Sequence, residues 1–382
     1  MADTSGDKTE NNRSPLNRKR RQFLKQFGII GAGVALSDLI LQQAFESVEA
    51  AQIKKMPPSE TMRLAQAPNT SAATSTGEIP RRPLGRTGVD VSAIGLGGYD
   101  LGKAPDLETA TRIVHEAIDA GINFMDNAWE YHQGRSEEWM GKALQGRRDK
   151  VFLMTKVCTH GRDAQVAMQQ LEESLRRLKT DYLDLWQIHE VIYYNDPELI
   201  FRPNGAIEAI EKAKQQGKVR FVGFTGHKDP DIHLQMLSSN YPFDTCQLPL
   251  NCFDATFSSF EQRVLPELNR RGIAPIGMKS LSGNGEAIKK GILAVREALG
   301  YAMSLPVATT VSGIPSLEVL RQNLGIARGF EPLSEQQIQA LRDRVRPYAS
   351  DGRFELFKTS KTFDGSIGRQ QHGFPTPEEV PT

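Results

Sequence analysis

The feature that most constrains the fold of this chain is an alternation, repeated eight times, of short β-rich runs with longer segments of helical periodicity. Parallel strands joined by crossover helices produce such an alternation. Eight strand-helix units in roughly 250 residues match the number and length of units in a closed (β/α)8 TIM barrel, an α/β fold. The expected strands are residues 91–95, 122–126, 151–156, 182–189, 219–225, 245–248, 274–279 and 309–313. The expected helices are residues 107–120, 136–144, 165–178, 206–216, 232–238, 260–271, 295–304 and 317–330.

An open, doubly wound parallel sheet is the structural alternative. That fold would need a glycine fingerprint in the turn between its first strand and its first helix, followed by an acidic residue. The run Gly95-Leu96-Gly97-Gly98 does follow a strand, but the third spaced glycine and the acidic residue are missing. The glycines therefore lend the open sheet little support.

The composition narrows the class of protein. With 382 residues, of which 39% are hydrophobic, the chain can bury a large core. It carries 47 Lys and Arg against 46 Asp and Glu, so no strong field attracts nucleic acid or an anionic surface. Cys158, Cys246 and Cys252 have no spacing typical of a disulfide framework, a metal site or an iron-sulfur cluster. We therefore expect three buried apolar side chains, no metal and no cluster.

Residues 1–51 have the order of parts of an export signal. A basic stretch that contains Arg20 and Arg21 precedes an apolar run at 27–36 and small residues at 48–50. The arginine pair, followed by Phe-Leu-Lys, resembles the twin-arginine (Tat) export motif. That resemblance implies recognition by the Tat translocase, export of the folded protein and a periplasmic location. The apolar run is too short for a stable membrane span.

Two alternatives for the amino terminus stay open: a basic arm followed by an ordinary amphipathic helix, and a tether that holds a cytoplasmic enzyme at a membrane. Residues 52–79 are rich in Ser, Thr, Pro and Ala without periodicity, which predicts a flexible linker. The barrel is expected over residues 80–346. Residues 347–382 form a C-terminal extension that we expect to pack on the barrel, either narrowing a pocket or sealing the outside.

Ionisable side chains end three successive expected strands, at Asp126, Lys156 and His189. Because the carboxyl ends of the strands of such a barrel meet at one mouth, we expect these side chains to lie close together. Tyr131 lies five positions after Asp126, in the following loop, and can reach the same mouth. Each residue alone could instead have a structural role, as a helix cap, a solvated strand end, a hydrogen-bonded core residue or a loop aromatic.

Together these four side chains suit proton transfer. An ammonium beside a phenol stabilises the phenolate and lowers the pKa of the phenol, while a carboxylate holds the ammonium charged and in place. We therefore expect Lys156 and Asp126 to lower the pKa of Tyr131. An imidazole at His189 would orient a carbonyl substrate and stabilise its developing alkoxide.

The motifs around these residues resemble those of the aldo-keto reductases, in order and in spacing. The resemblance covers about residues 82–346. The motifs are residues 121–131, which continue to 136–138 and 141–144, then 154–156, 171–178 leading into 181–185, and the strand that ends at His189.

The resemblance implies a nicotinamide-dependent oxidoreductase that reduces an aldehyde or ketone to an alcohol, or catalyses the reverse reaction. In that family, Asp126, Tyr131, Lys156 and His189 would form the catalytic tetrad, with Tyr131 as the general acid. The alternative is a dinucleotide-binding redox sensor or accessory subunit with little turnover. Retention of all four residues favours the enzyme.

The resemblance also implies that NADP(H) or NAD(H) lies across the barrel mouth. Met278 stands where many relatives place an aromatic ring against the nicotinamide, so we expect weaker stacking there. The expected cofactor-binding residues are Gly98, Tyr99, Asp126, Thr225, Gly226, Gln247, Met278, Lys279, Leu281, Gly313, Gln322 and Asn323.

The loop after the last strand leaves the choice between NADP and NAD open. The basic residues that many relatives use for the 2′-phosphate are missing at Gly313 and Val319, which leaves Arg321 as the nearby cation. A phosphate prefers a bidentate guanidinium. The habit of the family favours NADP.

The substrate is expected to be a small carbonyl compound or alcohol. Tyr99, Trp129 and the loop 190–203 would wall its pocket, with His189 at the reacting carbonyl. Aromatic walls suit apolar or sugar-like molecules.

Overall fold

The computed structural model of the chain describes residues 77–158, 162–361, 363–371 and 373–376. The expected export signal, and the expected linker up to residue 76, lie outside the described residues.

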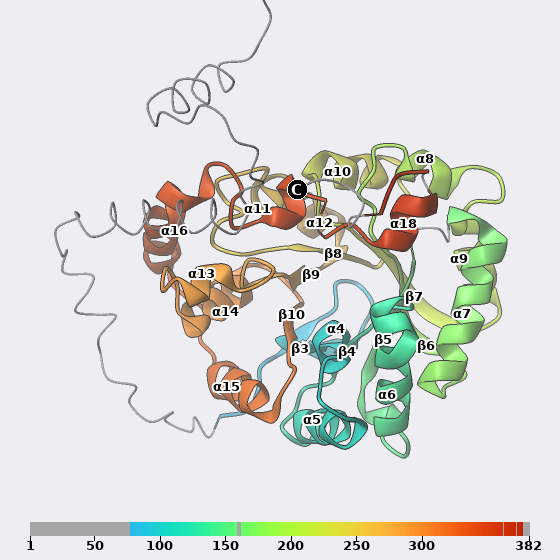
Figure 1. Ribbon diagram of the computed structural model, residues 1–382, viewed down its shortest axis with the longest axis horizontal. Helices are drawn as coiled ribbons and strands as arrows, with labels where there is room; N and C mark the ends of the chain where they lie inside the picture. Colours follow the sequence, from blue (N-terminus) through green and yellow to red (C-terminus); the bar gives the residue numbers. More distant parts are fainter. Residues whose placement is uncertain (1–76, 159–161, 362, 372, 377–382) are drawn as a thin grey trace, which may run out of the picture. The chain divides into compact units, whose positions relative to one another are not determined.

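Eight parallel strands close into a barrel, with the neighbour order β10-β3-β4-β5-β6-β7-β8-β9 (Figure 1). Strand order follows chain order around the ring, as the repeated strand-helix pattern predicts. The expected (β/α)8 fold is confirmed. The strands are β3 (Ile94–Gly97), β4 (Phe124–Asp126), β5 (Phe152–Val157), β6 (Leu183–Ile188), β7 (Val219–Thr225), β8 (Thr245–Pro249), β9 (Ala274–Met278) and β10 (Thr309–Gly313).

Amphipathic helices surround the strands (Figure 1). In the first long helix, α5, the buried residues Ala110, Ile113, Val114 and Ala117 repeat with the period of one helical face, and Asp106 caps the amino terminus by accepting from the backbone N of Thr109. The helices are α4 (Gly98–Leu101), α5 (Leu107–Asp119), α6 (Arg135–Ala143), α7 (Ala164–Leu178), α8 (Asp196–Phe201), α9 (Ala206–Gln215), α10 (Pro230–Ser238), α11 (Phe260–Arg263), α12 (Leu265–Arg271), α13 (Glu286–Lys289), α14 (Val295–Ser304), α15 (Leu317–Ala327), α16 (Glu335–Ala349), α17 (Leu356–Thr359) and α18 (Ser366–Gln371), with 3-10 turns η1 (Tyr131–Gly134) and η2 (Arg148–Lys150).

The first expected strand, residues 91–95, is in fact parts of two strands. Residues Asp90–Ser92 form β2, which pairs antiparallel with β1 (Arg81–Pro83), and β3 begins only at Ile94. The chain bends between them at Ala93, which donates from its backbone N to Pro80 O at 2.8 Å. The run Val91-Ser92-Ala93-Ile94-Gly95 has no strong turn signal at the bend, so periodicity alone cannot locate it.

The hairpin closes the amino-terminal end of the barrel. Leu84 and Val91 from the hairpin belong to the same buried cluster as Phe124, Phe152 and Leu185, which point inward from β4, β5 and β6. Successive side chains of a strand alternate between its two faces. We call this apolar cluster the plug. From it, the inward-facing side chains of each strand follow one another in layers to the carboxyl end of the strand.

Among the described residues, no helix combines the length and the apolar character that crossing a membrane requires. All three cysteines are buried, which confirms their expected burial, and none forms a disulfide with another described residue.

The C-terminal part of the chain packs on the barrel through buried charges. Helix α16 continues to Ala349, three residues past the boundary expected after residue 346. Beyond it, the Lys358 ammonium lies 2.6 Å from Asp254 Oδ1 and 2.9 Å from Glu355 Oε2, and all three groups are buried. Glu355 Oε1 also accepts from Asn251 Nδ2 at 3.0 Å. One buried ammonium therefore compensates the charge of two carboxylates that are shielded from water.

Replacing Lys358 by Met should reveal how strongly this cluster fastens the tail. The variant leaves the carboxyls of Asp254 and Glu355 buried without their cation, and removing one partner of a buried pair typically costs about 3–5 kcal/mol. We expect a loss of that size in the free energy of unfolding, measured by urea denaturation. Arg353→Ala, which breaks an exposed pair with Asp351, is the control and should change little. Equal losses in the two variants would contradict the buried anchor.

Candidate active site

The four expected catalytic side chains meet at the carboxyl ends of neighbouring strands. Asp126 ends β4, Lys156 lies near the end of β5, and His189 follows β6 directly. Asp126 and Lys156 occupy inward positions of their strands, and His189 continues the inward series of β6; each lies two or four residues above an apolar residue of the cluster below. Their exposed fractions are only 2%, 1% and 9%, respectively. The barrel thus places three ionisable groups in a largely dry mouth.

Lys156 is the centre of the group. Its ammonium donates to Asp126 Oδ1 at 2.7 Å, to the backbone oxygen of Asn127 at 2.8 Å and to the Tyr131 hydroxyl oxygen at 3.4 Å. All three directions of its hydrogen-bonding capacity are used. The ammonium is therefore fixed between a carboxylate and the phenol.

The loop after β4 turns sharply to bring Tyr131 over the mouth. His132 and Gln133 both adopt left-handed backbone conformations, with φ of 53° and 58°. Such conformations cost side-chain-bearing residues about 1–2 kcal/mol each, so the surrounding contacts must hold them. His132 Nε2 lies 2.8 Å from Tyr99 O, and the Tyr99 ring meets the Tyr131 ring edge-on at 5.3 Å.

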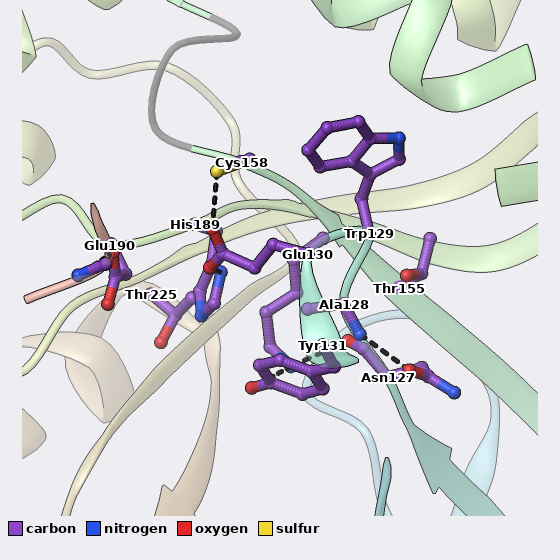
Figure 2. Close-up of polar contacts among 12 residues, drawn as sticks. Asn127, Ala128, Trp129, Glu130, Tyr131, Thr155, Cys158, His189, Glu190 and Thr225 are labelled. Atoms are coloured by element: carbon purple, nitrogen blue, oxygen red, sulfur yellow. Dashed lines mark hydrogen bonds and ion pairs between the residues drawn. The ribbon is translucent and has the colours of Figure 1, made fainter. Parts of the chain in front are cut away.

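Glu130 is a site residue that we did not expect from the sequence. Its Oε1 atom lies 2.7 Å from His189 Nδ1, and its Oε2 atom accepts from the Cys158 thiol at 2.5 Å (Figure 2). The sequence signal is a carboxylate directly before Tyr131. The direction in which a loop side chain points cannot be deduced from sequence spacing, so the pairing appears only in three dimensions.

The predicted lowering of the Tyr131 pKa is wrong in direction. Burial raises the pKa of Tyr131 well above its ordinary value, and the carboxylates of Asp126 and Glu130 raise it further. Burial also lowers the pKa of Lys156, against the pull of Asp126. The positive charge of Lys156 is thus balanced by the carboxylate of Asp126, and the influences that raise the pKa of Tyr131 prevail. A phenol with a raised pKa stays protonated, which is the form that can donate a proton.

The expected nicotinamide end of the mouth contains an unpaired amide oxygen. Gln247, on β8, donates from Nε2 to Asp126 Oδ2 at 2.9 Å, while its buried Oε1 has no hydrogen-bond partner among the described residues. Such a buried acceptor fits the amide N–H of a nicotinamide carboxamide. Thr225, at the end of β7, lies beside it in strand register and is 4.0 Å from Met278 Sδ. These residues fit the expected cofactor.

The expected phosphate end lies around the start of α15. Ser316 caps that helix by accepting from the backbone N of Val319, and Asn323 donates to Ser312 Oγ at 3.0 Å. Arg321, the nearby cation, forms a two-pronged exposed pair with Glu116 at 2.8 and 3.2 Å. Because exposed pairs contribute little stability, a phosphate could compete for this guanidinium.

The remaining expected cofactor positions lie around the mouth in different surroundings. Gly98 begins α4, Tyr99 is half exposed, and Gly226 follows β7 so closely against Val191 O that a side chain would not fit. The other three are Leu281 in the loop after β9, Gly313 at the end of β10 against the carboxyl of Asp100, and Gln322 on the exposed face of α15.

Lys279 is covered by the C-terminal segment. Its ammonium lies 5.2 Å from the ring centres of both Phe357 and Phe363. Burial lowers the pKa of Lys279 to about 8. Gly365 N donates to Glu190 Oε2 at 3.0 Å, and Lys228 pairs with Asp364 at 2.5 Å. The tail thus reaches the loops that follow β6, β7 and β9.

Trp129 points away from the tetrad. Figure 2 shows its indole on the far side of the loop from Tyr131. The indole N–H donates to Glu173 on α7 at 2.8 Å, and the Arg177 guanidinium lies over the ring at 5.3 Å. These two contacts fix the loop to α7. The indole therefore does not face the tetrad, as a wall of the substrate pocket would.

Comparisons with known proteins identify the family. The family model described as "Aldo/keto reductase family" matches residues 93–287, slightly more than half of the chain. The chain therefore belongs to the aldo/keto reductase family, whose members are oxidoreductases that reduce carbonyl compounds with NADP(H). The described residues contain no group of three or more His, Cys, Asp or Glu side chains that could hold a metal ion.

Several relatives match the chain along nearly their whole length. The oxidoreductase YqkF of Bacillus subtilis is 29% identical over 70% of this chain and 96% of its own. The L-galactose dehydrogenase of Arabidopsis thaliana is 28% identical over 68% of this chain and 92% of its own. The 6-dehydroglucose reductase of Novosphingobium aromaticivorans is also 28% identical, over 66% and 90%.

Solved structures share the fold. An aldo-keto reductase of Bacillus halodurans in its holo form has a TM-score of 0.60 and 26% identity, covering 70% of this chain and 96% of its own. An aldo/keto reductase of Klebsiella pneumoniae, solved in complex with NADP and acetate, has a TM-score of 0.57 and 24% identity, covering 72% and 98%.

Replacing Gln247 by Leu should weaken dinucleotide binding. The change removes the buried acceptor and its bond to Asp126, and an unpaired buried polar group costs about 1–3 kcal/mol. That cost corresponds to a rise of roughly 5- to 150-fold in the Kd for NADPH, measured by fluorescence titration. The control is Gln187→Leu, which makes the same chemical change one layer deeper, where Gln187 donates to Thr245. If Gln187→Leu raised the Kd more than Gln247→Leu, the carboxamide would not be bound at Gln247.

Proposed function

We propose that this protein is an NADP(H)- or NAD(H)-dependent carbonyl reductase or alcohol dehydrogenase in which Tyr131 is the general acid. The observation that carries the proposal is the Lys156 ammonium, which bridges Asp126 and the hydroxyl of Tyr131 at the edge of a dry barrel mouth. His189 lies across from the phenol, with its ring 5.7 Å from the Tyr131 ring and edge-on to it. The two rings are close enough for the Tyr131 hydroxyl and the His189 imidazole to contact one carbonyl oxygen.

The proposed division of labour follows from these contacts. The bound nicotinamide would supply the hydride, or accept it in the reverse direction. Tyr131 would donate its proton to the carbonyl oxygen as the alkoxide develops, because an alkoxide is a stronger base than a phenolate. Lys156 would stabilise the phenolate that remains, and Asp126 keeps Lys156 in place. The low exposure of the mouth strengthens each of these electrostatic interactions.

The proposed cofactor contacts are divided between the two ends of the mouth. Gln247 and Thr225 would hold the carboxamide, and Asn323 with the capped start of α15 would hold the phosphate end. NADP is favoured by the family, and Arg321 could meet its 2′-phosphate only by leaving Glu116. We therefore propose a modest preference for NADP(H) over NAD(H).

We propose small sugar-like carbonyl compounds as substrates. The relatives named L-galactose dehydrogenase and 6-dehydroglucose reductase support this choice. In this chain, Tyr99 is the exposed aromatic ring beside Tyr131, and such a ring suits a sugar-like molecule. Partners other than a small molecule are not part of the proposed reaction.

Tyr131→Phe tests the reaction. With a panel of sugar-derived and apolar carbonyl compounds, the wild type should oxidise NADPH, and the variant should be slower by about 10²- to 10⁴-fold, the usual contribution of a general acid. The control is Tyr348→Phe, at an exposed tyrosine of α16. Equal rates in wild type and Tyr131→Phe would refute the proposed acid. NADPH binding with no turnover of any compound would favour the sensor.

We also propose that the protein is exported through the Tat translocase, on the strength of Arg20-Arg21 and the apolar run that follows. Replacing both arginines by Lys should leave most of the protein in the cytoplasm, because the translocase recognises the pair. Fractionation of a bacterium that carries the translocase, followed by immunoblotting, measures this. Arg18→Lys, in the same basic stretch, is the control. An unchanged periplasmic fraction in the double variant would reject this route.

A further inference from the structure

Glu130 stands between two side chains of the mouth and touches both. Its Oε1 atom is 2.7 Å from His189 Nδ1, and its Oε2 atom accepts from the Cys158 thiol at 2.5 Å. Figure 2 draws the Cys158 thiol, the Glu130 carboxyl, the His189 ring and the Tyr131 hydroxyl one below the other. Because Cys158 is fully buried directly after β5, the second contact fixes the direction of the carboxyl.

The contact with Nδ1 determines what His189 can do. A carboxylate has no proton to give, so at this 2.7 Å separation a proton on Nδ1 is favoured, because a bare nitrogen would meet a lone pair of the carboxylate. A neutral imidazole carries one proton, and Nε2 is then a bare acceptor. An acceptor cannot hydrogen-bond to a carbonyl oxygen. His189 therefore gains a donor at Nε2 only when it is protonated at both nitrogens.

The charges around His189 oppose each other. Burial is the largest influence and leaves the pKa of His189 below its ordinary value, while the carboxylate of Glu130 raises it; Lys156 lowers it and Asp126 raises it by smaller amounts. The titratable or charged side chains packed around the imidazole from the neighbouring elements are Asp126, Glu130, Tyr131, Lys156, Arg162, Glu190 and His227.

We propose that Glu130 is a positioning residue that locks His189 in one orientation and one tautomer, so that His189 contacts the substrate oxygen as an imidazolium donor in reduction and as a neutral acceptor in oxidation. This inference rests on the proposed reductase function and deepens it. It assigns to Glu130 a role that the four tetrad residues do not supply. The carboxylate also compensates the positive charge that His189 carries while it donates.

The inference predicts a particular pH dependence. In reduction, kcat/KM should fall as the pH rises through the pKa of His189, because the donor form is lost. Glu130→Gln removes the charge that stabilises the imidazolium, so this limb should move to lower pH. If the new amide donates to Nδ1 instead, neutral His189 carries its proton on Nε2 and the limb should vanish. At a pH above both pKa values, each unit of movement lowers kcat/KM about tenfold.

Glu190→Gln is the matched control. It makes the same substitution at a neighbouring buried carboxyl group of the mouth, but Glu190 accepts from the backbone N of Gly365, and its charge is not among the main influences on the pKa of His189. We expect its limb to stay within a few tenths of a pH unit of the wild type. A Glu130→Gln profile that keeps the wild-type limb, or equal movements in both variants, would overturn the role of Glu130.

A measurement without substrate separates this inference from the proposed function. In protein labelled with 15N-histidine, the His189 signals are identified by their loss in His189→Asn. Neutral wild-type His189 should carry its proton on Nδ1, and only Nε2 should titrate. A proton on Nε2 in the neutral wild type would overturn the inference even if Tyr131→Phe abolishes turnover. The expected tautomer together with full activity of Tyr131→Phe would instead refute the general acid.

Discussion

The structure of the mouth depends on one buried cation. Lys156 is 1% exposed, and an ammonium removed from water is stable only when partners replace its hydration. Asp126, the backbone oxygen of Asn127 and the hydroxyl of Tyr131 are those partners. They come from β4 and the loop after it, whereas Lys156 is on β5. The parallel pairing of β4 with β5 brings these elements together, so the charge arrangement depends on the fold.

The two ends of the barrel divide stability from chemistry. At the amino-terminal end, the β1-β2 hairpin and inward Phe, Leu and Met side chains form a dry plug. At the carboxyl-terminal end, the inward-facing side chains are polar: Asp126, Lys156, His189, Thr225 and Gln247. Each polar group there rests on the apolar layer below. The polar residues of the mouth are therefore held in place by the apolar layer, which supplies the hydrophobic burial in their stead.

The C-terminal segment is part of the surroundings of the site. Its anchor is the Lys358 ammonium, buried between Asp254 and Glu355, and its aromatic rings lie on Lys279. Because Lys279 follows β9 in the loop at the expected cofactor end, the segment and the mouth share residues. A change in the tail can thus alter the electrostatics of the mouth through Lys279.

The sequence by itself determined the closed barrel, the strands that build it and the convergence of Asp126, Tyr131, Lys156 and His189. It could do so because strand and helix periodicity are local properties, and parallel strands of a barrel end at one rim. The bend at Ala93, the turn of Trp129 toward α7 and the pairing of Glu130 with His189 were decided only by the tertiary structure. So was the direction of the Tyr131 pKa, because burial and the sum of nearby charges depend on all elements around the mouth, and no spacing along the chain encodes them.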